Sequence, residues 1–395
     1  MSGRIYFDNS ATTPLDPRVR EAMEPFLADT FGNPSSLHVE GRQAREAVEQ
    51  ARDQVARLVG ATPDEIVFTG SGTEADNLAL IGALPADGAA SAHIVVSAIE
   101  HPAILATCRH LERLGVTVSE VQPDPDGILD PTAVASAIRT NTRLVSVMAA
   151  NNVVGTLQPV TLIGALAREH GVLFHTDAVQ AAGKIPLDVA AMNVDLLSLS
   201  AHKLHGPKGV GALFVRKGVA LGPIVHGGGQ ERGLRSATEN VAGIVGFGRA
   251  AEIAREEMAS EAARLVTLRD RILGALANAL PHAYLIGHRY KRLPGHVCLG
   301  IAGYEGETIK LLLALDEAGV ATSTGSACSA HHAGEPSSIL LAMGFDPIRA
   351  RGSLRITLGR FNTDAEVDRF LDVLPQAVAT LRPLTHRAQL ERSLS

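Results

Sequence analysis

The chain has 395 residues, a formal net charge of −6, and 46% hydrophobic and 20% charged residues. This balance is typical of a globular enzyme with a sizeable core, and it argues against a nucleic-acid surface that depends on bulk positive charge. No uninterrupted apolar stretch reaches the length of a membrane span, and the opening MSGRIYFDNSATTP lacks the basic and apolar regions of a signal peptide. We therefore expect a cytoplasmic protein whose thiols stay reduced.

The first 240 residues alternate between predicted helices and strands. Asp16 and Pro17 suit the N-cap and first position of a helix, and residues 36–60 read as a long amphipathic helix that ends at Gly60. Short apolar strands then alternate with helices, and these strands are predicted within residues 65–70, 93–101, 116–122, 142–150, 172–180, 194–203 and 210–215. Such alternation predicts a parallel or mixed sheet with helices on both faces.

The pattern changes near residue 240. Residues 239–276 read as one long helical stretch, and the elements after it are shorter and more mixed. We expect a large domain of residues 15–257. A smaller domain would contain residues 1–14 and 258–395, with the N-terminal tail packed against the C-terminal part.

A glycine-rich turn follows the first predicted strand of this series, in FTGSGTEADN at residues 68–77. The free N–H groups and the positive end of the next helix would form a seat for phosphate around Gly72, with the Thr73 hydroxyl added. The spacing matches neither a P-loop nor a dinucleotide fingerprint. The alternative is an ordinary glycine turn between two elements.

Two later strands end in chemically active side chains. Asp177 ends the strand in VLFHTDAVQ, at the edge where open α/β sheets bind ligands. Its carboxylate either forms the N-cap of the next helix or pairs with a protonated pyridine nitrogen. The next strand delivers Ser200, His202 and Lys203. A lysine in such a place either forms a Schiff base or extends from the strand end into solvent. The second alternative suits Lys208, in the same stretch, better than Lys203. A phosphate seat, an acid and a reactive lysine together are what pyridoxal phosphate requires.

The three cysteines are too widely spaced to indicate a zinc site. Cys108 and Cys298 lie in helical and strand-like patterns, so we predict that both are small buried hydrophobes. Cys328 differs, because its surroundings TSTGSACSAHHAG are small and polar. Either Cys328 is incidental to a loop, or the loop exists to carry a reactive thiol.

From end to end, the chain resembles the pyridoxal-phosphate cysteine desulfurases, the NifS/IscS-like group of the class V aminotransferase family. The motifs that carry the resemblance are YFDNSATTP, FGNPSSLHVEGRQAR, FTGSGTEADN, EHPAI, HTDAVQAAGK, SAHKLHGPKGVGAL, HGGGQERGLRSATEN, STGSACSA and GSLRITLGRF. The resemblance implies an α/β fold of the fold-type I pyridoxal-phosphate transferases. Its large domain would have a mixed, mostly parallel sheet flanked by helices, and its smaller domain would be α+β.

The resemblance also implies roles for individual residues. Lys203 would hold pyridoxal 5'-phosphate and move protons, Asp177 would keep the pyridine nitrogen protonated, and His101 would stack on the ring with an acid–base role. The remaining cofactor contacts would be Gly72, Thr73, Ser200, His202 and a neighbouring subunit's Thr238 at the phosphate, Gln180 at the phenolic oxygen, and Asn152 beside the ring. Asn33 and Arg355 resemble the clamp for the substrate carboxylate, which a guanidinium binds through two parallel hydrogen bonds. Active sites that share Thr238 require a homodimer.

Cys328 resembles the nucleophile that takes sulfur from L-cysteine, which leaves L-alanine and a persulfide. The sulfur would pass to an acceptor or iron–sulfur scaffold protein, for cluster assembly or for thiolation of tRNA or DNA. Cys328 is also a candidate ligand of a transferred iron–sulfur cluster, and we expect no other metal, no direct nucleic-acid binding and no membrane contact. His331 and His332 either lower the pKa of Cys328 or are solvated loop residues.

Two positions depart from the family pattern. Val153 in NNVVG stands where the family often has glutamate, and Ala237 in RSATEN stands where glycine is common, a change that we expect to affect packing only. Two rival functions stay open. Another class V aminotransferase or lyase would have no use for Cys328, whereas an inactive sulfur carrier or scaffold would have no use for Lys203 and Asp177.

Overall fold

The computed structural model describes residues 3–85, 91–325 and 335–381. At its centre is a seven-stranded sheet with the order β2-β8-β7-β6-β5-β3-β4. Its strands are β2 (Ile66–Thr69), β3 (His93–Ser97), β4 (Thr117–Val121), β5 (Thr142–Ser146), β6 (Leu173–Asp177), β7 (Leu196–Ser200) and β8 (Gly211–Val215). The pairs from β4 to β7 are parallel, and β8 is antiparallel to both β7 and β2. The predicted mixed, mostly parallel sheet is confirmed.

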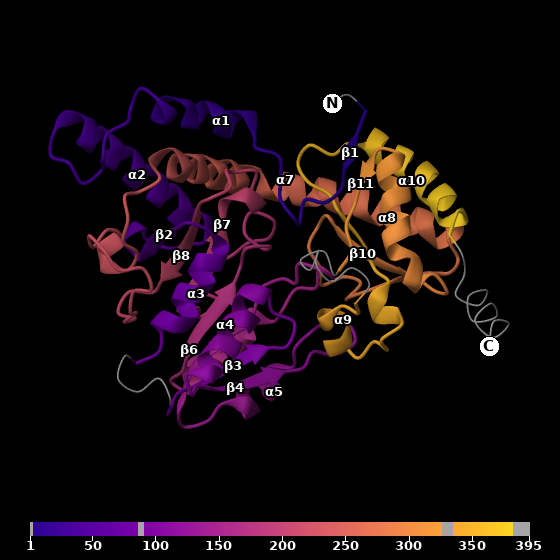
Figure 1. Ribbon diagram of the computed structural model, residues 1–395, viewed down its shortest axis with the longest axis horizontal. Coiled ribbons are helices and arrows are strands. Elements are labelled where there is room, and N and C mark those ends of the chain that lie inside the picture. The colour runs from indigo at the N-terminus through magenta and orange to yellow at the C-terminus, as the bar shows by residue number, and fades with distance from the viewer. Residues whose placement is uncertain (1–2, 86–90, 326–334, 382–395) are drawn as a thin grey trace.

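Helices cover both faces of this sheet (Figure 1). They are α1 (Pro17–Met23), α2 (Val39–Leu58), α3 (Gly72–Gly82), α4 (Pro102–Arg113), α5 (Pro131–Ala137), α6 (Val160–Glu169) and the first part of α7 (Val241–Ala279). Alternate side chains of a strand point to opposite faces, so Phe68 of β2 belongs to one apolar cluster and Val67 to another. Asp16 caps α1 as predicted, because its Oδ1 accepts a hydrogen bond from the Arg18 main-chain N–H at 2.9 Å.

A second core is built from both ends of the chain. Its strands are β1 (Ile5–Tyr6), β9 (Ala283–Leu285), β10 (His296–Ile301), β11 (Val320–Ala321) and β12 (Leu354–Thr357), and its helices include α8 (Thr308–Glu317), α9 (Ser338–Ala342) and α10 (Asp364–Ala379). The strand β1 pairs with β11 in parallel, and the rings of Phe7 and Phe370 lie 5.5 Å apart. Figure 1 accordingly shows the indigo N-terminal strand among the orange and yellow C-terminal elements. The predicted packing of the N-terminal tail is confirmed.

One helix joins the two cores. The 39 residues of α7 run without a break, which confirms the single long helix predicted from the sequence. Ile253 and Ala254 belong to the core around the large sheet, whereas Leu265 and Leu268 belong to the second core. The division at residue 257 into a large and a small domain stays a prediction, and α7 crosses it. Within the described residues, neither α7 nor any other helix is long and apolar enough to span a membrane.

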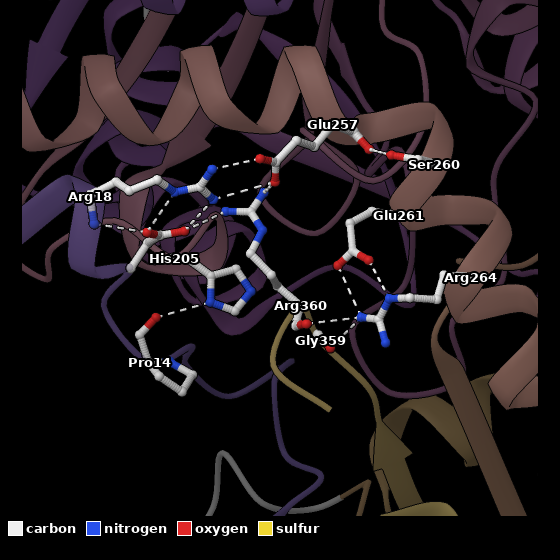
Figure 2. Close-up of polar contacts among 10 residues, drawn as sticks. Pro14, Arg18, His205, Glu257, Ser260, Glu261, Arg264, Gly359 and Arg360 are labelled. Atoms are coloured by element: carbon white, nitrogen blue, oxygen red, sulfur yellow. Dashed lines mark hydrogen bonds and ion pairs between the residues drawn. The ribbon is translucent and has the colours of Figure 1, made fainter. Parts of the chain in front are cut away.

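A network of charges fixes the junction between the cores (Figure 2). Arg18 binds Asp16 at 2.8 Å and Glu257 at 2.6 Å, and Arg360, after β12, binds Asp16 at 2.9 Å and Glu257 at 3.2 Å. Asp16 is only 1% exposed. Burial alone would raise the pKa of Asp16, but hydrogen bonds from Arg18 and Arg360 hold it well below its usual range. The network therefore links α1, α7 and the segment after β12.

We expect Arg360→Met to lower the free energy of unfolding by about 3 kcal/mol. The loss comes mainly from the buried carboxylate of Asp16, which is left with one cation fewer, because Glu257 is partly exposed. Because the pKa of Asp16 is depressed in the folded protein, the stability that its carboxylate contributes is fully present above the ordinary carboxyl pKa. This stability is lost as the pH falls through the folded-state pKa of Asp16. In urea unfolding, the difference in free energy of unfolding between Arg360→Met and the wild type should therefore become smaller as the pH is lowered. Arg271→Met removes the more exposed ion pairs to Asp364 and Asp368 and serves as the control, with an expected loss of at most about 1 kcal/mol. Equal losses of unfolding free energy in Arg360→Met and Arg271→Met would contradict a stabilising role of the buried charge network.

Candidate active site

A cavity of about 320 Å³ lies at the carboxyl ends of β6 and β7. The structure brings most of the predicted site residues to its wall, namely Gly72, Thr73, His101, Asn152, Asp177, Gln180, Ser200, His202, Lys203 and Arg355. These residues come from both cores and from six separate parts of the chain, so only the folded protein assembles them. Sequence reasoning did not single out Ser10, Ala11 or Asp76, which also line the cavity.

The N-terminus of α3 forms one end of the cavity. Ser71 caps the helix, since its Oγ accepts a hydrogen bond from the Glu74 main-chain N–H at 3.1 Å. The first N–H groups of a helix have no partner within the helix, and this end carries the positive end of its dipole. A Cβ at Gly72 would lie 2.8 Å from Val179 Cγ2 and 3.3 Å from Ser200 Cβ. A glycine is therefore needed here for Val179 and Ser200 to pack against the start of the helix.

Asp177 is the last residue of β6 and is 6% exposed. Its Oδ1 accepts a hydrogen bond from the Val179 main-chain N–H at 2.9 Å, so it does stabilise the following turn. Burial raises the pKa of Asp177, and the charges of His101 and Lys203 oppose this shift. A cation placed against the carboxylate would stabilise its ionised form, which is what a protonated pyridine nitrogen supplies.

His101 begins α4 and faces the same cavity. Its Nδ1 accepts a hydrogen bond from the Ala103 main-chain N–H at 3.1 Å, so the proton of the neutral ring resides on Nε2. Burial lowers the pKa of His101; Asp177 opposes that shift and Lys203 adds to it. The ring is therefore neutral at pH 7, with an N–H group as its remaining donor.

Lys203 lies in a short 3₁₀ turn, Ala201–Lys203, directly after β7. Its Nζ donates hydrogen bonds to the main-chain oxygens of Ser10 at 2.5 Å and Ala11 at 2.8 Å. Gln180 Nε2 donates to the same Ser10 oxygen at 2.9 Å. The amine thus stays at the cavity instead of extending into solvent, and the N-terminal segment forms the wall that holds it.

Arg355 of β12 is 2% exposed and forms another part of the wall. Its guanidinium donates to the Asn152 main-chain oxygen at 3.0 Å and to Asp8 Oδ1 at 2.7 Å. The Arg355 main chain also exchanges two hydrogen bonds with Ser323. Ser323 precedes Cys328 by five residues in the sequence; Cys328, His331 and His332 lie outside the described residues.

The cavity fits pyridoxal phosphate. Two buried oxygens of residues in its wall, Asn152 Oδ1 and Asp76 Oδ1, have no hydrogen-bond partner within the described part of the chain. Buried polar atoms of this kind are rare in native proteins and call for a partner. The helix N-terminus suits a phosphate, the Asp177 carboxylate suits a pyridinium, and Lys203 supplies an amine, so the donor set matches the whole group.

Two predicted residues do not reach the cavity of their own chain. Asn33 is exposed in the segment before α2, where its Oδ1 accepts a hydrogen bond from the Ser35 main-chain N–H at 2.9 Å. Within one chain it therefore does not form a clamp with Arg355. Thr238 is exposed in the loop before α7 and is likewise absent from the described cavity wall.

The departures from the family pattern have different structural settings. Val153 is 2% exposed and packs in an apolar cluster with Ile286 and Met343. The expectation that Ala237 affects packing only is wrong. Ala237 is exposed and has a φ of +129°, a conformation that favours glycine because a Cβ is strained there. The change from glycine therefore acts on the backbone.

The other two cysteines are confirmed as buried. Cys108 and Cys298 are 2% and 0% exposed, and neither forms a disulfide. Burial raises the pKa of each thiol to about 12. Neither thiol can supply a thiolate at neutral pH.

The chain is similar to known proteins over nearly its whole length. The family model for class V aminotransferases matches residues 5–370. The chain is 46% identical over 385 residues to cysteine desulfurase IscS of Dictyoglomus turgidum, covering 98% of this chain and 97% of that protein. It is 47% identical over 384 residues to cysteine desulfurase IscS of Methanosarcina thermophila, covering 96% and 94%. A solved NifS-like protein superposes with a TM-score of 0.88 at 40% identity, over 95% of this chain and 99% of that one.

Proposed function

The chain belongs to the class V aminotransferase family and depends on pyridoxal phosphate, and we propose that it is a cysteine desulfurase that transfers sulfur from L-cysteine to Cys328. The observation that carries the proposal is the meeting of Lys203, Asp177 and the N-terminus of α3 at one cavity. Arg355 lies in the wall of that cavity, and its main chain is hydrogen-bonded to Ser323, which precedes Cys328 by five residues in the sequence. An aminotransferase would need the first three features but would have no use for Cys328.

The residues of the wall divide the work of holding the cofactor. The N-terminus of α3, with Ser200 and His202, would hold the phosphate; burial lowers the pKa of His202 to about 4, so it binds as a neutral ring. Asp177 would keep the pyridine nitrogen protonated, Gln180 would face the phenolic oxygen, and Asn152 would lie beside the ring. When bound, pyridoxal phosphate withdraws electrons from the α-carbon of an amino acid joined to it.

The remaining residues would act on the substrate. Arg355 would bind the L-cysteine carboxylate with its guanidinium, and Asp8 and Asn152 already fix the position of that guanidinium. Lys203 Nζ would accept and return the proton at the α-carbon, and His101 would present its Nε2 proton on the cavity side. Arg355 is buried and His101 and Lys203 are half-buried, which limits the access of water.

Sulfur transfer would require a thiolate on Cys328. The thiolate attacks the substrate sulfur, so that an S–S bond forms as the substrate C–S bond breaks. A proton delivered to the former β-carbon completes L-alanine, and Cys328 is left as a persulfide. The persulfide sulfur then passes to an acceptor protein, for iron–sulfur cluster assembly or another thiolation, in the cytoplasm.

Incubation of the holoenzyme with L-cysteine tests the function. We expect one L-alanine for each persulfide formed or, when a thiol reductant is added, for each sulfide released. We also expect a yellow protein whose absorption borohydride bleaches. Formation of a keto acid without sulfur transfer would favour another class V aminotransferase. A colourless protein that cannot take up pyridoxal phosphate would favour an inactive carrier.

The enzyme is proposed to be a homodimer with shared active sites. Thr238 is exposed and outside the cavity wall of its own chain, which leaves it available to a second subunit. Large apolar side chains are exposed on the segment that also carries Asn33, namely Leu27 (67%), Phe31 (78%), Leu37 (84%) and Val39 (50%). Several large exposed apolar side chains within one segment are typical of an interface.

Complementation between two inactive variants tests the shared site. We expect Thr238→Glu to lose cofactor binding, because its carboxylate would repel the phosphate, and Lys203→Ala to lose activity. If each site combines Lys203 of one subunit with Thr238 of the other, a hybrid dimer has one intact site. Mixing after mild dissociation should then restore up to about half the activity per hybrid dimer. Mixtures that stay inactive although hybrids form, or an active monomer, would contradict the shared site.

A further inference from the structure

Lys184 is an ionisable residue beside the site that the proposed reaction does not use. It follows Gln180 by four residues, in the turn after β6. The main-chain N–H groups of residues 184 and 185 both donate to the oxygen of residue 181, which gives this stretch a helical turn. Residues four apart on such a turn lie on the same side. Lys184 Nζ accordingly donates a hydrogen bond to Gln180 Oε1 at 3.2 Å.

The surroundings of Lys184 make this contact its main polar interaction. Lys184 lines a second cavity of about 60 Å³, which shares Ser10 and Lys203 with the cofactor cavity. Among the described residues, no carboxylate lies within ion-pair distance of its amine. Burial lowers the pKa of Lys184 to about 7, and the charges of Lys203 and Arg355 act in the same direction. Placing a lysine here is unfavourable unless its amine has a polar partner, and Gln180 Oε1 is that partner.

The contact determines which end of the Gln180 amide faces which group. An amide has an accepting oxygen and a donating nitrogen that can exchange places by rotation. Here the oxygen receives the N–H of Lys184, and the nitrogen Nε2 donates to Ser10 at the wall of the cofactor cavity. The phenolic oxygen of pyridoxal phosphate is an acceptor, so it requires the nitrogen end.

We propose that Lys184 is a positioning residue that holds the Gln180 amide with its N–H donor toward the phenolic oxygen of the cofactor. The inference rests on the proposed function and adds a residue to its site. Without the Lys184 donor, the amide can turn and place its oxygen against the phenolic oxygen. Two acceptors would then face each other, and the anionic form of the phenol would be less stable.

The test is the absorption of the bound cofactor as a function of pH, without substrate, in Lys184→Met. Loss of one hydrogen bond to the phenolate should raise the pH at which the absorption band changes by about one unit. The kcat for L-cysteine should fall about tenfold. Its KM should change by less than about twofold, because Arg355 and not Gln180 binds the carboxylate. Lys184→Arg keeps a donor and should restore the band, and the exposed Lys217→Met is the control.

A double-mutant cycle separates positioning from a direct effect of charge or folding. If Lys184 acts through Gln180, adding Lys184→Met to Gln180→Ala should change neither the band nor kcat further. A full additional shift in the Gln180→Ala background overturns the proposal, and so does an unchanged band in Lys184→Met holoenzyme that folds and turns over normally. If Lys184→Met does not fold, a displaced band in Lys184→Arg overturns it. A wild type that cannot bind pyridoxal phosphate overturns the proposed function as well, so the two failures are distinguishable.

Discussion

Lys203→Ala is expected to abolish covalent retention of pyridoxal phosphate and to lower turnover of L-cysteine by a factor of at least about 10³. Lys203 is the amine that the structure holds at the cavity, through hydrogen bonds to the main-chain oxygens of Ser10 and Ala11. No other amine in the described wall of the cavity can take its place. Absorption spectra before and after borohydride, together with alanine formation, measure both effects.

The Lys203→Ala protein should remain folded, because the substitution removes only side-chain contacts of the short turn after β7 and leaves β7 intact. Its urea midpoint should stay close to that of the wild type. Lys208→Ala is the matched control, since Lys208 is exposed five residues later in the same stretch. It should keep the reducible chromophore. A chromophore that borohydride reduces onto the Lys203→Ala protein would show that another residue holds the cofactor.

Cys328→Ser is expected to bind pyridoxal phosphate and L-cysteine normally but to form no persulfide. In the proposed mechanism, cofactor and substrate binding depend on residues of the cavity wall, whereas sulfur transfer depends on a thiolate. A serine hydroxyl has too high a pKa to supply an anion, and oxygen is a poor acceptor of sulfur. Alanine formation should fall by at least about 10³-fold. The wild-type protein should gain a mass of about 32 Da after incubation with L-cysteine, one sulfur atom, and the variant should gain none.

The other cysteines should not rescue this variant. Burial raises the pKa of both Cys108 and Cys298 to about 12, so neither supplies a thiolate near neutrality. Cys108→Ala is therefore the control and should still gain the sulfur mass. If Cys328→Ser forms alanine at the wild-type rate without added reductant, Cys328 is only a loop residue and the enzyme is another kind of class V catalyst.

Local signals were sufficient to predict the elements of the fold. The N-cap at Asp16, the apolar periodicity of α2 and the unbroken pattern of α7 depend on neighbours within a few residues, and all three are confirmed. The placement of Lys203 and Asp177 at the ends of buried strands was also readable, because parallel strands bring their carboxyl ends to one edge. These signals are short-range or follow directly from strand direction.

Features of the site that depend on tertiary structure could not be predicted from the sequence in the same way. The oxygens of Ser10 and Ala11 that hold Lys203 belong to the main chain, so no side-chain pattern marks them. Asn33 carries a family motif, but its position relative to Arg355 depends on how the segment before α2 is placed in three dimensions. Ala237 differs from glycine by one methyl group, and only the backbone angle shows why that matters.

The pairing of β1 with β11 has a consequence for the order of folding during synthesis. Ile5 and Tyr6 pair with Val320 and Ala321, and a ribosome adds about 5–20 residues per second. The earliest strand therefore waits roughly 15–60 s for its partner to be made. Ile5 and Phe7, which are buried in the finished protein, remain in water during that time. By then, the residues of the core around the large sheet have already been synthesised. Residues translated first are thus among the last to fold, and a chain released before Val320 would have the lysine but not the ordered N-terminal oxygens that hold it.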